Sequence, residues 1–163
     1  VLVSTAKKFK SDLTIVKSVI KSNDNRYKHL ISKIFKLMNN KIKNKNITFL
    51  GVTFKAGTDD MRESPSLNII PTLSKRGANI NYYDPSGIKD NFKKFKNVKF
   101  CSNINQACKN SDLLIIHTEW NEFKQLNFKN LYKNRNFKIY DMRNLYSPSK
   151  MKKNKINYFG IGR

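Results

Sequence analysis

The chain has 163 residues and carries 33 Lys and Arg against 11 Asp and Glu, a formal net charge of +22. A hydrophobic content of 39% and an aromatic content of 12% indicate a folded chain rather than a disordered basic tail. The length suits one domain with an extra element at one end. No apolar run approaches the roughly 20 residues of a membrane helix, and no signal peptide opens the chain. We therefore expect a cytoplasmic protein without a membrane span.

The high positive charge has two interpretations. A nucleic-acid-binding or membrane-surface module would carry such a charge. The basic residues, however, are 27 Lys and only 6 Arg, they are spread along the whole chain, and they accompany 22 Asn and 16 Ile, residues with A/T-rich codons. We expect solvated surface charge and no specific nucleic acid, and keep a basic nucleic-acid-binding module as the alternative.

Residues 1–43 contain no Gly or Pro, and their apolar residues recur at helical spacing. The pattern predicts a first helix over 1–9 and a second from Asp12, capped by Ser11 and continuing to Met38. A helix of that length projects beyond a single core, so its apolar stripe needs another surface. We expect residues 1–44 to form a helical segment that pairs two copies in a homodimer, and 45–163 to form a second domain.

From residue 47 the pattern changes to strands that alternate with helices. Strands are predicted at 47–52, 80–84, 98–101, 112–118 and 137–141, with a possible final edge strand at 156–162. Helices are predicted from Ser64-Pro65 to Gly77 and at 103–110 and 127–133, with a helical or irregular segment at 87–96. This alternation predicts an α/β fold, a Rossmann-like open parallel sheet with flanking helices, preceded by the long N-terminal helical segment.

In an open parallel sheet the binding crevice lies beyond the carboxyl ends of the strands. That rule gathers four segments at one rim, which are 53–62, Asp84, 117–120 and 141–143. Residues far apart in the sequence, such as Lys55 and Arg143, are therefore expected to converge.

The segment GVTFKAGTDDMRESPS, residues 51–66, contains neither a GxGxxG fingerprint nor a P-loop. It offers phosphate two cations, Lys55 and Arg62, and the backbone amides of a helix that starts at Ser64-Pro65. Its three acidic residues can pair with these cations and hold them in place; they are Asp59, Asp60 and Glu63. The alternative is an ordinary loop with surface ion pairs, each contributing about 1 kcal/mol or less.

The same segment carries a resemblance to a known family, whose pattern is G-[LV]-[TA]-F-K-x-x-T-[DG]-D-x-R-E-S-P-S. Later stretches agree with that family, namely YDP at 83–85, TEWNEF at 118–123 and DMRNLY at 141–146. Over roughly residues 45–147 the chain resembles the C-terminal domain of the UDP-glucose 6-dehydrogenases, within the UDP-glucose/GDP-mannose dehydrogenase family. The helical opening is similar to the segment that precedes this domain in the family.

The resemblance implies an NAD-dependent oxidation of UDP-glucose to UDP-glucuronate. Phe54 would meet the nucleotide sugar through its backbone and by packing, and Lys55 by hydrogen bonds to sugar hydroxyls or phosphate. Arg143 would also reach the UDP-sugar. Arg62 would cross the interdomain cleft toward NAD bound on another domain. The remaining alternative within the family is a dehydrogenase of UDP-N-acetylmannosamine or GDP-mannose.

The family's catalytic apparatus is not found in these 163 residues. The reaction needs an N-terminal GxGxxG domain and the cysteine of a G-x-C-F-x-K-D segment, and Cys101 and Cys108 lie in the wrong context. Val1 follows closely on the position of that cysteine segment, and no initiator Met is present. We therefore expect a fragment that has no catalytic residues, binds UDP-glucose weakly and turns nothing over.

Other candidate residues have simpler structural interpretations. Asp84 stands where nucleotide-binding strands often carry a ribose-binding acid, but Asp-Pro also favours a turn. Glu119 and Trp120 are expected to serve packing and loop anchoring, and His117 to be a hydrogen-bonded structural histidine. The two cysteines, seven residues apart, fit no metal motif and are expected to be reduced structural thiols.

Overall fold

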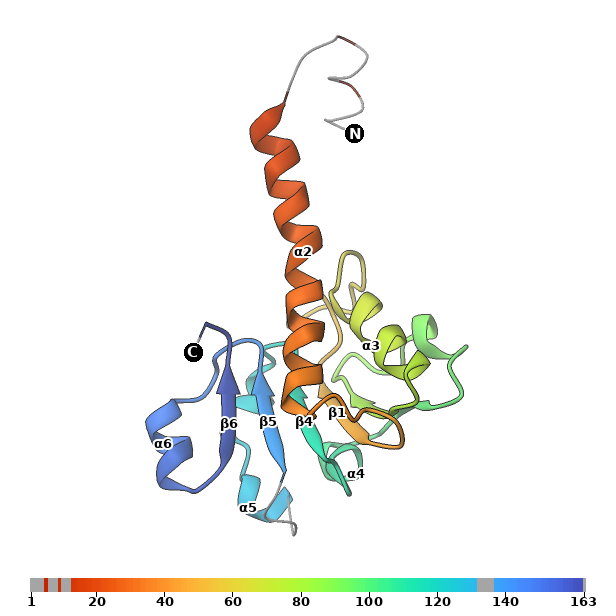
Figure 1. Ribbon diagram of the computed structural model, residues 1–163. Coiled ribbons are helices and arrows are strands. Elements are labelled where there is room, and N and C mark those ends of the chain that lie inside the picture. The colour runs from red at the N-terminus through yellow and green to blue at the C-terminus, as the bar shows by residue number, and fades with distance from the viewer. Residues whose placement is uncertain (1–4, 6–8, 10–12, 132–136, 163) are drawn as a thin grey trace.

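The computed structural model describes residues 5, 9, 13–131 and 137–162 (Figure 1). The helix expected over 1–9 falls almost entirely outside the described residues. Ser11, the expected cap of the second helix, lies outside them as well. The second expected helix is present as α2, Thr14–Leu37.

Helix α2 stands on the sheet by its C-terminal half and projects from it by its N-terminal half (Figure 1). Leu30, Ile34 and Leu37 are buried in the core. Near the other end, Ile15 is 81% exposed and Val19 is 53% exposed. The sheet domain thus covers the apolar residues in the C-terminal half of α2 and leaves those near its N-terminal end exposed.

Six strands form one sheet in the order β3-β2-β1-β4-β5-β6, and every neighbouring pair is parallel. They are β1 (Asn46–Leu50), β2 (Asn79–Tyr83), β3 (Val98–Phe100), β4 (Leu113–Ile116), β5 (Lys138–Asp141) and β6 (Asn157–Gly160). The expected Rossmann-like parallel sheet is confirmed, including the edge strand that ends the chain.

The crossovers carry short helices. They are α3 (Ser66–Lys75), η1 (Asp90–Phe92), α4 (Ile104–Cys108), η2 (Asn121–Gln125), α5 (Phe128–Leu131) and α6 (Pro148–Lys153). The sequence pattern did not predict η2 or α6. Each is only a turn or two long, too short for an apolar periodicity to show.

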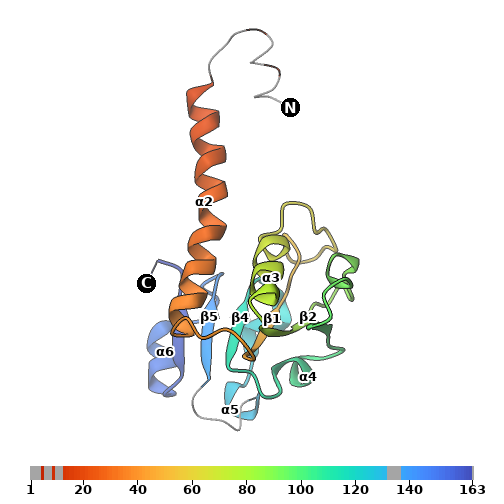
Figure 2. The same cartoon turned by 45° about the vertical axis from the view of Figure 1, so that its right-hand side comes forward.

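The core lies on both faces of the sheet because successive strand residues point to opposite sides. In β1, Phe49 belongs to the cluster that contains the buried residues of α2 and α3. Its neighbour Leu50 belongs to a second cluster, with Phe128 of α5 and Met151 of α6. Figure 2 shows α2 and α3 together on one face of the strands. The strands are therefore apolar on both faces, as parallel strands between two helical layers must be.

The start of α3 differs from the expectation. Its N-cap position is Pro65, with no side-chain cap, whereas Ser64 was expected to cap the helix. The Ser64 hydroxyl donates to the carbonyl oxygen of Val52 at 2.7 Å, and the Ser66 hydroxyl donates to the same oxygen at 2.6 Å. The Ser64 oxygen also accepts a long hydrogen bond from the Ser66 N–H at 3.4 Å, so this hydroxyl serves both the buried carbonyl at the strand end and the first turn of the helix. The helix ends at Lys75, and Gly77 follows it with a φ of 83°, as expected of a glycine that terminates a helix.

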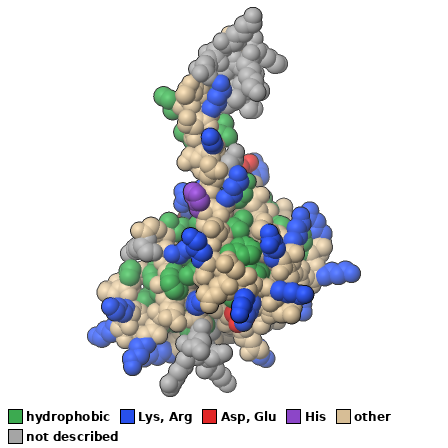
Figure 3. All heavy atoms as spheres, in the orientation of Figure 1, with side chains coloured by type: hydrophobic (Ala, Val, Ile, Leu, Met, Phe, Trp, Pro, Cys, Tyr) green, Lys and Arg blue, Asp and Glu red, His purple; other side chains and the backbone are tan. Residues whose placement is uncertain are grey.

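Lys and Arg side chains are spread over the face seen in Figure 3, from α2 to the bottom of the sheet, rather than gathered in one patch. Acidic side chains are few on this face, in line with the composition. Among the described residues, no helix combines the length and hydrophobicity that a membrane span requires.

Candidate functional site

The loops that follow β1, β2, β4 and β5 share one rim of the sheet because all four strands run the same way. Backbone hydrogen bonds continue the ladder into these loops. The Gly51 N–H donates to Tyr83 at 2.8 Å, and the Met142 N–H donates to Ile116 at 2.9 Å. The rim is thus an extension of the sheet, which positions its side chains rigidly.

Arg143 reaches across this rim to the loop that follows β1. Its Nη2 donates to the carbonyl oxygen of Phe54 at 3.1 Å, and its Nε donates to the carbonyl oxygen of His117 at 2.8 Å. Lys55 directly follows the carbonyl that Arg143 holds. The structure therefore brings Phe54, Lys55 and Arg143 together, while their roles toward a ligand stay predictions.

The side chains of Phe54 and Lys55 are open to solvent. Phe54 is 47% exposed, which is unusual for a large apolar ring. Lys55 is exposed and forms no ion pair among the described residues. An exposed ring beside an unneutralised ammonium suits a ligand that has both a flat or apolar part and negative charge.

Glu119 is the acidic neighbour of Arg143. Its Oε2 lies 2.8 Å from Nε of Arg143. The single hydrogen on Nε points to the His117 carbonyl, so this contact is ionic and not a hydrogen bond. Oε2 is buried and has no hydrogen-bond partner among the described residues. The sequence patterns identified Glu119 only as a packing and loop-anchoring residue, although its place directly after a strand, with Arg143 after the next one, was a signal for this pairing.

Asp84 anchors the β1 loop from beneath. Its Oδ2 accepts hydrogen bonds from the backbone N–H groups of Val52 at 2.7 Å and Thr53 at 3.3 Å. Its Oδ1 accepts from the backbone N–H of Ser86 at 3.0 Å. The side chain is 1% exposed and its oxygens are occupied by the chain itself. Of the two interpretations of Asp84, turn and loop chemistry is the one that the structure bears out.

Behind Asp84 lies a buried cation, Lys89, which is 5% exposed. Its Nζ donates to the hydroxyl of Ser86 at 2.8 Å, and that hydroxyl donates to Oδ1 of Asp84. The chain of contacts runs from Lys89 through Ser86 and Asp84 to the N–H groups at the start of the site loop. Sequence reasoning missed Lys89, because a lysine after a strand usually lies in solvent.

In the acidic loop, Asp60 alone pairs with a cation among the described residues. Its carboxylate accepts hydrogen bonds from Nε of Arg62 at 3.0 Å and from Nη2 of Arg62 at 2.8 Å. This two-pronged bond to Arg62 lowers the pKa of Asp60 to about 2. Asp59 and Glu63 have no such partner among the described residues, so the expectation that all three acids hold the cations is correct for Asp60 only.

His117 is fully buried beneath the rim and its Nδ1 lies 3.0 Å from the hydroxyl oxygen of Thr118. Burial, with a smaller contribution from the charge of Arg143, lowers the pKa of His117 to about 3. The imidazole is thus neutral at physiological pH and hydrogen-bonded to its neighbour. Both features agree with a structural histidine.

Thr118 ties the β4 loop to the β1 loop. Its hydroxyl donates to the carbonyl oxygen of Thr53 at 2.8 Å. At Gly51, whose φ is 75°, a Cβ atom would lie 2.5 Å from Cβ of Thr118. The close approach explains why glycine starts this loop, because any side chain would push the two loops apart.

A crevice with a volume of about 470 Å³ adjoins the predicted ligand residues. It lies at the ends of β1 and β4, where the strand order reverses its direction. The lining residues are Ala56, Gly57, Trp120, Asn121 and Glu122. The buried indole Nε1 of Trp120 has no hydrogen-bond partner among the described residues. The crevice continues the rim formed by Phe54 and Lys55 and has the size of a small ligand site.

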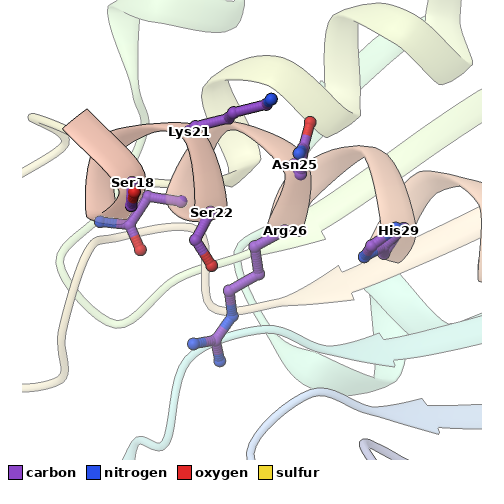
Figure 4. A pocket seen from close by; sticks show the side chains of 7 residues that line it. Ser18, Lys21, Ser22, Asn25, Arg26 and His29 are labelled. Carbon is purple, nitrogen blue, oxygen red and sulfur yellow. The ribbon is translucent and has the colours of Figure 1, made fainter. Parts of the chain in front are cut away.

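A second hollow lies on the projecting part of α2, away from this rim (Figure 4). All seven of its lining residues belong to that one helix; they are Ser18, Lys21, Ser22, Asn23, Asn25, Arg26 and His29. The hollow includes none of the predicted site residues. The described residues also offer no cluster of three or more His, Cys, Asp or Glu side chains that could hold a metal ion.

Both cysteines are buried and neither forms a disulfide. Cys101 ends the β3 segment and is 5% exposed, and burial raises the pKa of its thiol. A thiol whose pKa is raised is a poor nucleophile. These features support the structural interpretation of the two cysteines.

Comparison with known proteins agrees with the motifs. The domain described as "UDP-glucose/GDP-mannose dehydrogenase family, UDP binding domain" matches residues 48–148. The UDP-glucose 6-dehydrogenase of Rickettsia felis is 39% identical over 154 residues, which are 93% of this chain and 34% of that protein. That of Rhizobium meliloti is 33% identical over 163 residues, 99% of this chain and 37% of that protein. The chain thus spans about a third of the length of these relatives.

The fold agrees as well. The crystal structure of the NDP-N-acetyl-D-galactosaminuronic acid dehydrogenase from Methanosarcina mazei Go1 superposes with a TM-score of 0.84 at 22% sequence identity. That superposition covers 99% of this chain and 36% of the other one. Taken with the family match over residues 48–148, the chain belongs to the UDP-glucose/GDP-mannose dehydrogenase family and carries its UDP binding domain.

Proposed function

We propose that this chain is the nucleotide-sugar-binding part of an NAD-dependent UDP-glucose 6-dehydrogenase, which oxidises UDP-glucose to UDP-glucuronate. Phe54, Lys55 and Arg143 bind UDP-glucose at the rim of the sheet. The observation that carries the proposal is the hydrogen bond from Arg143 to the Phe54 carbonyl, which puts two cations at one rim. The names of the relatives with 33–39% identity support UDP-glucose as the sugar nucleotide.

The residues at the rim suit the parts of this ligand. The diphosphate carries negative charge, which the Lys55 ammonium and the Arg143 guanidinium attract. The exposed ring of Phe54 offers an apolar face to the sugar or the base. We infer that Lys55 moves to meet the ligand, whereas Arg143 is already held in place by two hydrogen bonds.

Arg62 is proposed to contact NAD that is bound by another domain. The residue fits this role, because its side chain is 89% exposed while Asp60 holds its Nε and Nη2. The two N–H groups of Nη1 have no partner among the described residues and can reach an anion such as the NAD pyrophosphate. When bound, NAD would accept the hydride that is removed from the substrate.

The proposal includes a homodimer formed through α2. The projecting half of the helix exposes Ile15, Val19 and Ile20, and the four-residue spacing of Ile15 and Val19 places these two on one side of the helix. A second copy would cover this apolar stripe, and sedimentation equilibrium of the chain should report a dimer. Ile15→Glu combined with Val19→Glu should return a monomer. We place the protein in the cytoplasm, in keeping with two buried cysteines that form no disulfide, and its acidic sugar product in polysaccharide biosynthesis.

Isothermal titration calorimetry of the 163-residue chain with UDP-glucose tests the binding site. We expect weak binding that falls at least about tenfold in Lys55→Ala and in Arg143→Ala, since each change removes a charged contact to the diphosphate. Lys96→Ala is the matched control, because Lys96 is exposed and precedes β3, at the opposite rim of the sheet. Its affinity should equal that of the wild type.

Two further titrations separate the alternatives. GDP-mannose should bind more weakly than UDP-glucose, and the reverse order would point to a sister dehydrogenase. A random oligonucleotide should show no tight, steeply salt-dependent binding, which would be the mark of a nucleic-acid module. Equal affinity for UDP-glucose in the wild type and both site variants would refute the proposed site.

A further inference from the structure

The guanidinium of Arg143 has more donors than the protein uses. Arginine carries five N–H groups in a rigid fork. One donates to the His117 carbonyl and one to the Phe54 carbonyl. The remaining three N–H groups have no acceptor among the residues that the structure describes. The side chain is 31% exposed, so these donors are open to a ligand.

Glu119 contributes charge to Arg143 without using any of those three donors. Its Oε2 lies 2.8 Å from Nε, off the axis of the one N–H that Nε carries. Burial of a carboxylate oxygen without a hydrogen-bond donor is unfavourable unless a cation lies close by. Arg143 is that cation, so each of the two charges favours the present position of the other.

The backbone that carries Glu119 is fixed on both sides of the rim. The preceding residue, Thr118, donates its hydroxyl to the Thr53 carbonyl, and Gly51 leaves no space between the loops for a side chain. The following residue, Trp120, lines the crevice at the ends of β1 and β4. The carboxylate is thus presented to Arg143 from a rigid support, which a flexible surface ion pair lacks.

We propose that Glu119 is a positioning residue for Arg143, fixing the guanidinium so that its three unused N–H groups are ready for the diphosphate of a nucleotide sugar. This role rests on the proposed function only in naming the ligand. A competing role, in which Glu119 occupies the cation until ligand displaces it, would require the carboxylate to accept the N–H groups that the ligand needs. The carboxylate accepts neither of the two Arg143 N–H groups that are bonded and none of the other three.

The first arm of the test needs no ligand. The side-chain Nε–H signal of Arg143 is followed in ¹H–¹⁵N spectra of the ligand-free chain, and its exchange with solvent is measured. We expect slow exchange in the wild type, several-fold faster exchange in Glu119→Gln and an intermediate rate in Glu119→Asp. Glu122→Gln is the matched control, because this carboxylate lies in the same segment but contacts Tyr83. Unchanged exchange in Glu119→Gln would overturn the positioning role.

The second arm measures binding of UDP by calorimetry. Glu119→Gln should weaken binding by about two- to fivefold, the range expected for one partly exposed ion pair acting through preorganisation. In an Arg143→Lys background the same change should have no further effect, because the two residues act as one unit. Equal weakening in both backgrounds, or tighter binding in Glu119→Gln, would contradict the proposal.

The two arms distinguish the failures. If the wild-type chain does not bind UDP while Glu119→Gln still speeds the exchange of the Arg143 Nε–H, the proposed ligand is wrong and the positioning role stands. UDP can also bind with an affinity that Lys55→Ala and Arg143→Ala both lower. If Glu119→Gln then changes neither the exchange of the Arg143 Nε–H nor the affinity for UDP, the proposed function stands and the positioning role is refuted.

Discussion

The carbonyl oxygen of Phe54 accepts a hydrogen bond from Nη2 of Arg143 at 3.1 Å, across 89 residues of sequence. This bond joins the loop after β1 to the loop after β5, two strands that are separated by β4 in the sheet. The guanidinium therefore spans the end of β4, where it also meets the His117 carbonyl. A single side chain thus organises three of the four loops at the candidate site.

Gly51→Ala should destabilise the protein strongly. The new Cβ would lie 2.5 Å from Cβ of Thr118, at a φ of 75° that disfavours alanine. Thr118 cannot turn away easily, because its hydroxyl is bonded to the Thr53 carbonyl. We expect the free energy of unfolding, measured in urea, to fall by about 3 kcal/mol or more.

Gly57→Ala is the control for this prediction. Its φ of 73° is nearly the same, but no atom lies within 4 Å of the added Cβ. Only the backbone conformation is penalised, at a cost of about 1–2 kcal/mol. Equal losses in the two variants would show that the approach of Gly51 to Thr118 is not what demands glycine.

Asp84→Asn should loosen the base of the site loop. In the wild type the backbone N–H groups of Val52 and Ser86 donate to the two carboxylate oxygens. The amide keeps only one acceptor oxygen, so its NH₂ group must face one of these two N–H donors. We expect the free energy of unfolding to fall by about 2–3 kcal/mol. Asp90→Asn serves as the comparison, because Asp90 forms an exposed ion pair with Lys93 and its replacement should lower the free energy of unfolding much less.

His117 should make the stability depend on pH. Its pKa is lowered to about 3 in the folded chain, from 6.5 in an unfolded one, so the unfolded state binds the extra proton below pH 6.5. Stability is therefore complete above pH 6.5 and is lost as the pH falls toward 3. Between pH 6.5 and 5, before most carboxylates titrate, the slope should approach about 1.4 kcal/mol per pH unit.

The control for His117 is the other histidine of the chain. His117→Gln should flatten the pH dependence between pH 6.5 and 5, even if it also lowers stability at every pH. His29→Gln should keep the wild-type slope, because His29 is exposed on α2. A slope that is the same in all three proteins would exclude a buried neutral His117.

Asp60 should titrate far below an ordinary aspartate. Its pKa of about 2 reflects hydrogen bonds from Arg62, of which those from the side chain have the larger effect and that from the backbone N–H the smaller. The stabilisation is thus present above the ordinary pKa of 3.8 and is lost as the pH falls through about 2. A ¹³C NMR titration of the carboxyl group should show the low value.

Removal of each cation should act on its own partner. Arg62→Ala should move the pKa of Asp60 up toward 3.8 and leave Asp90 unchanged. Lys93→Ala should raise the pKa of Asp90, which Lys93 lowers, and leave Asp60 unchanged. A pKa of Asp60 that stays low without Arg62 would mean that another group holds it there.

The sequence by itself determined the order and type of the main elements. Apolar runs bounded by turn residues located all six strands, and their alternation with helices required a parallel sheet with its loops at one rim. The family motif then selected Phe54, Lys55 and Arg143, and the rim rule predicted that they converge. The prediction of the sheet and of this convergence succeeded because both depend on periodicity and chain direction, which are local properties; the roles of the three residues toward a ligand stay predictions.

The tertiary structure alone decided what each polar side chain contacts. It directed the Ser64 hydroxyl to the Val52 carbonyl, used Asp84 to hold the β1 loop, and set Glu119 beside Arg143. The partners of Ser64 and Asp84 could not be predicted from spacing, because these pairs are 12 and 32 residues apart and meet only when the sheet has formed. Buried polar atoms take the nearest available partner in space, and that partner depends on the packing of the whole domain.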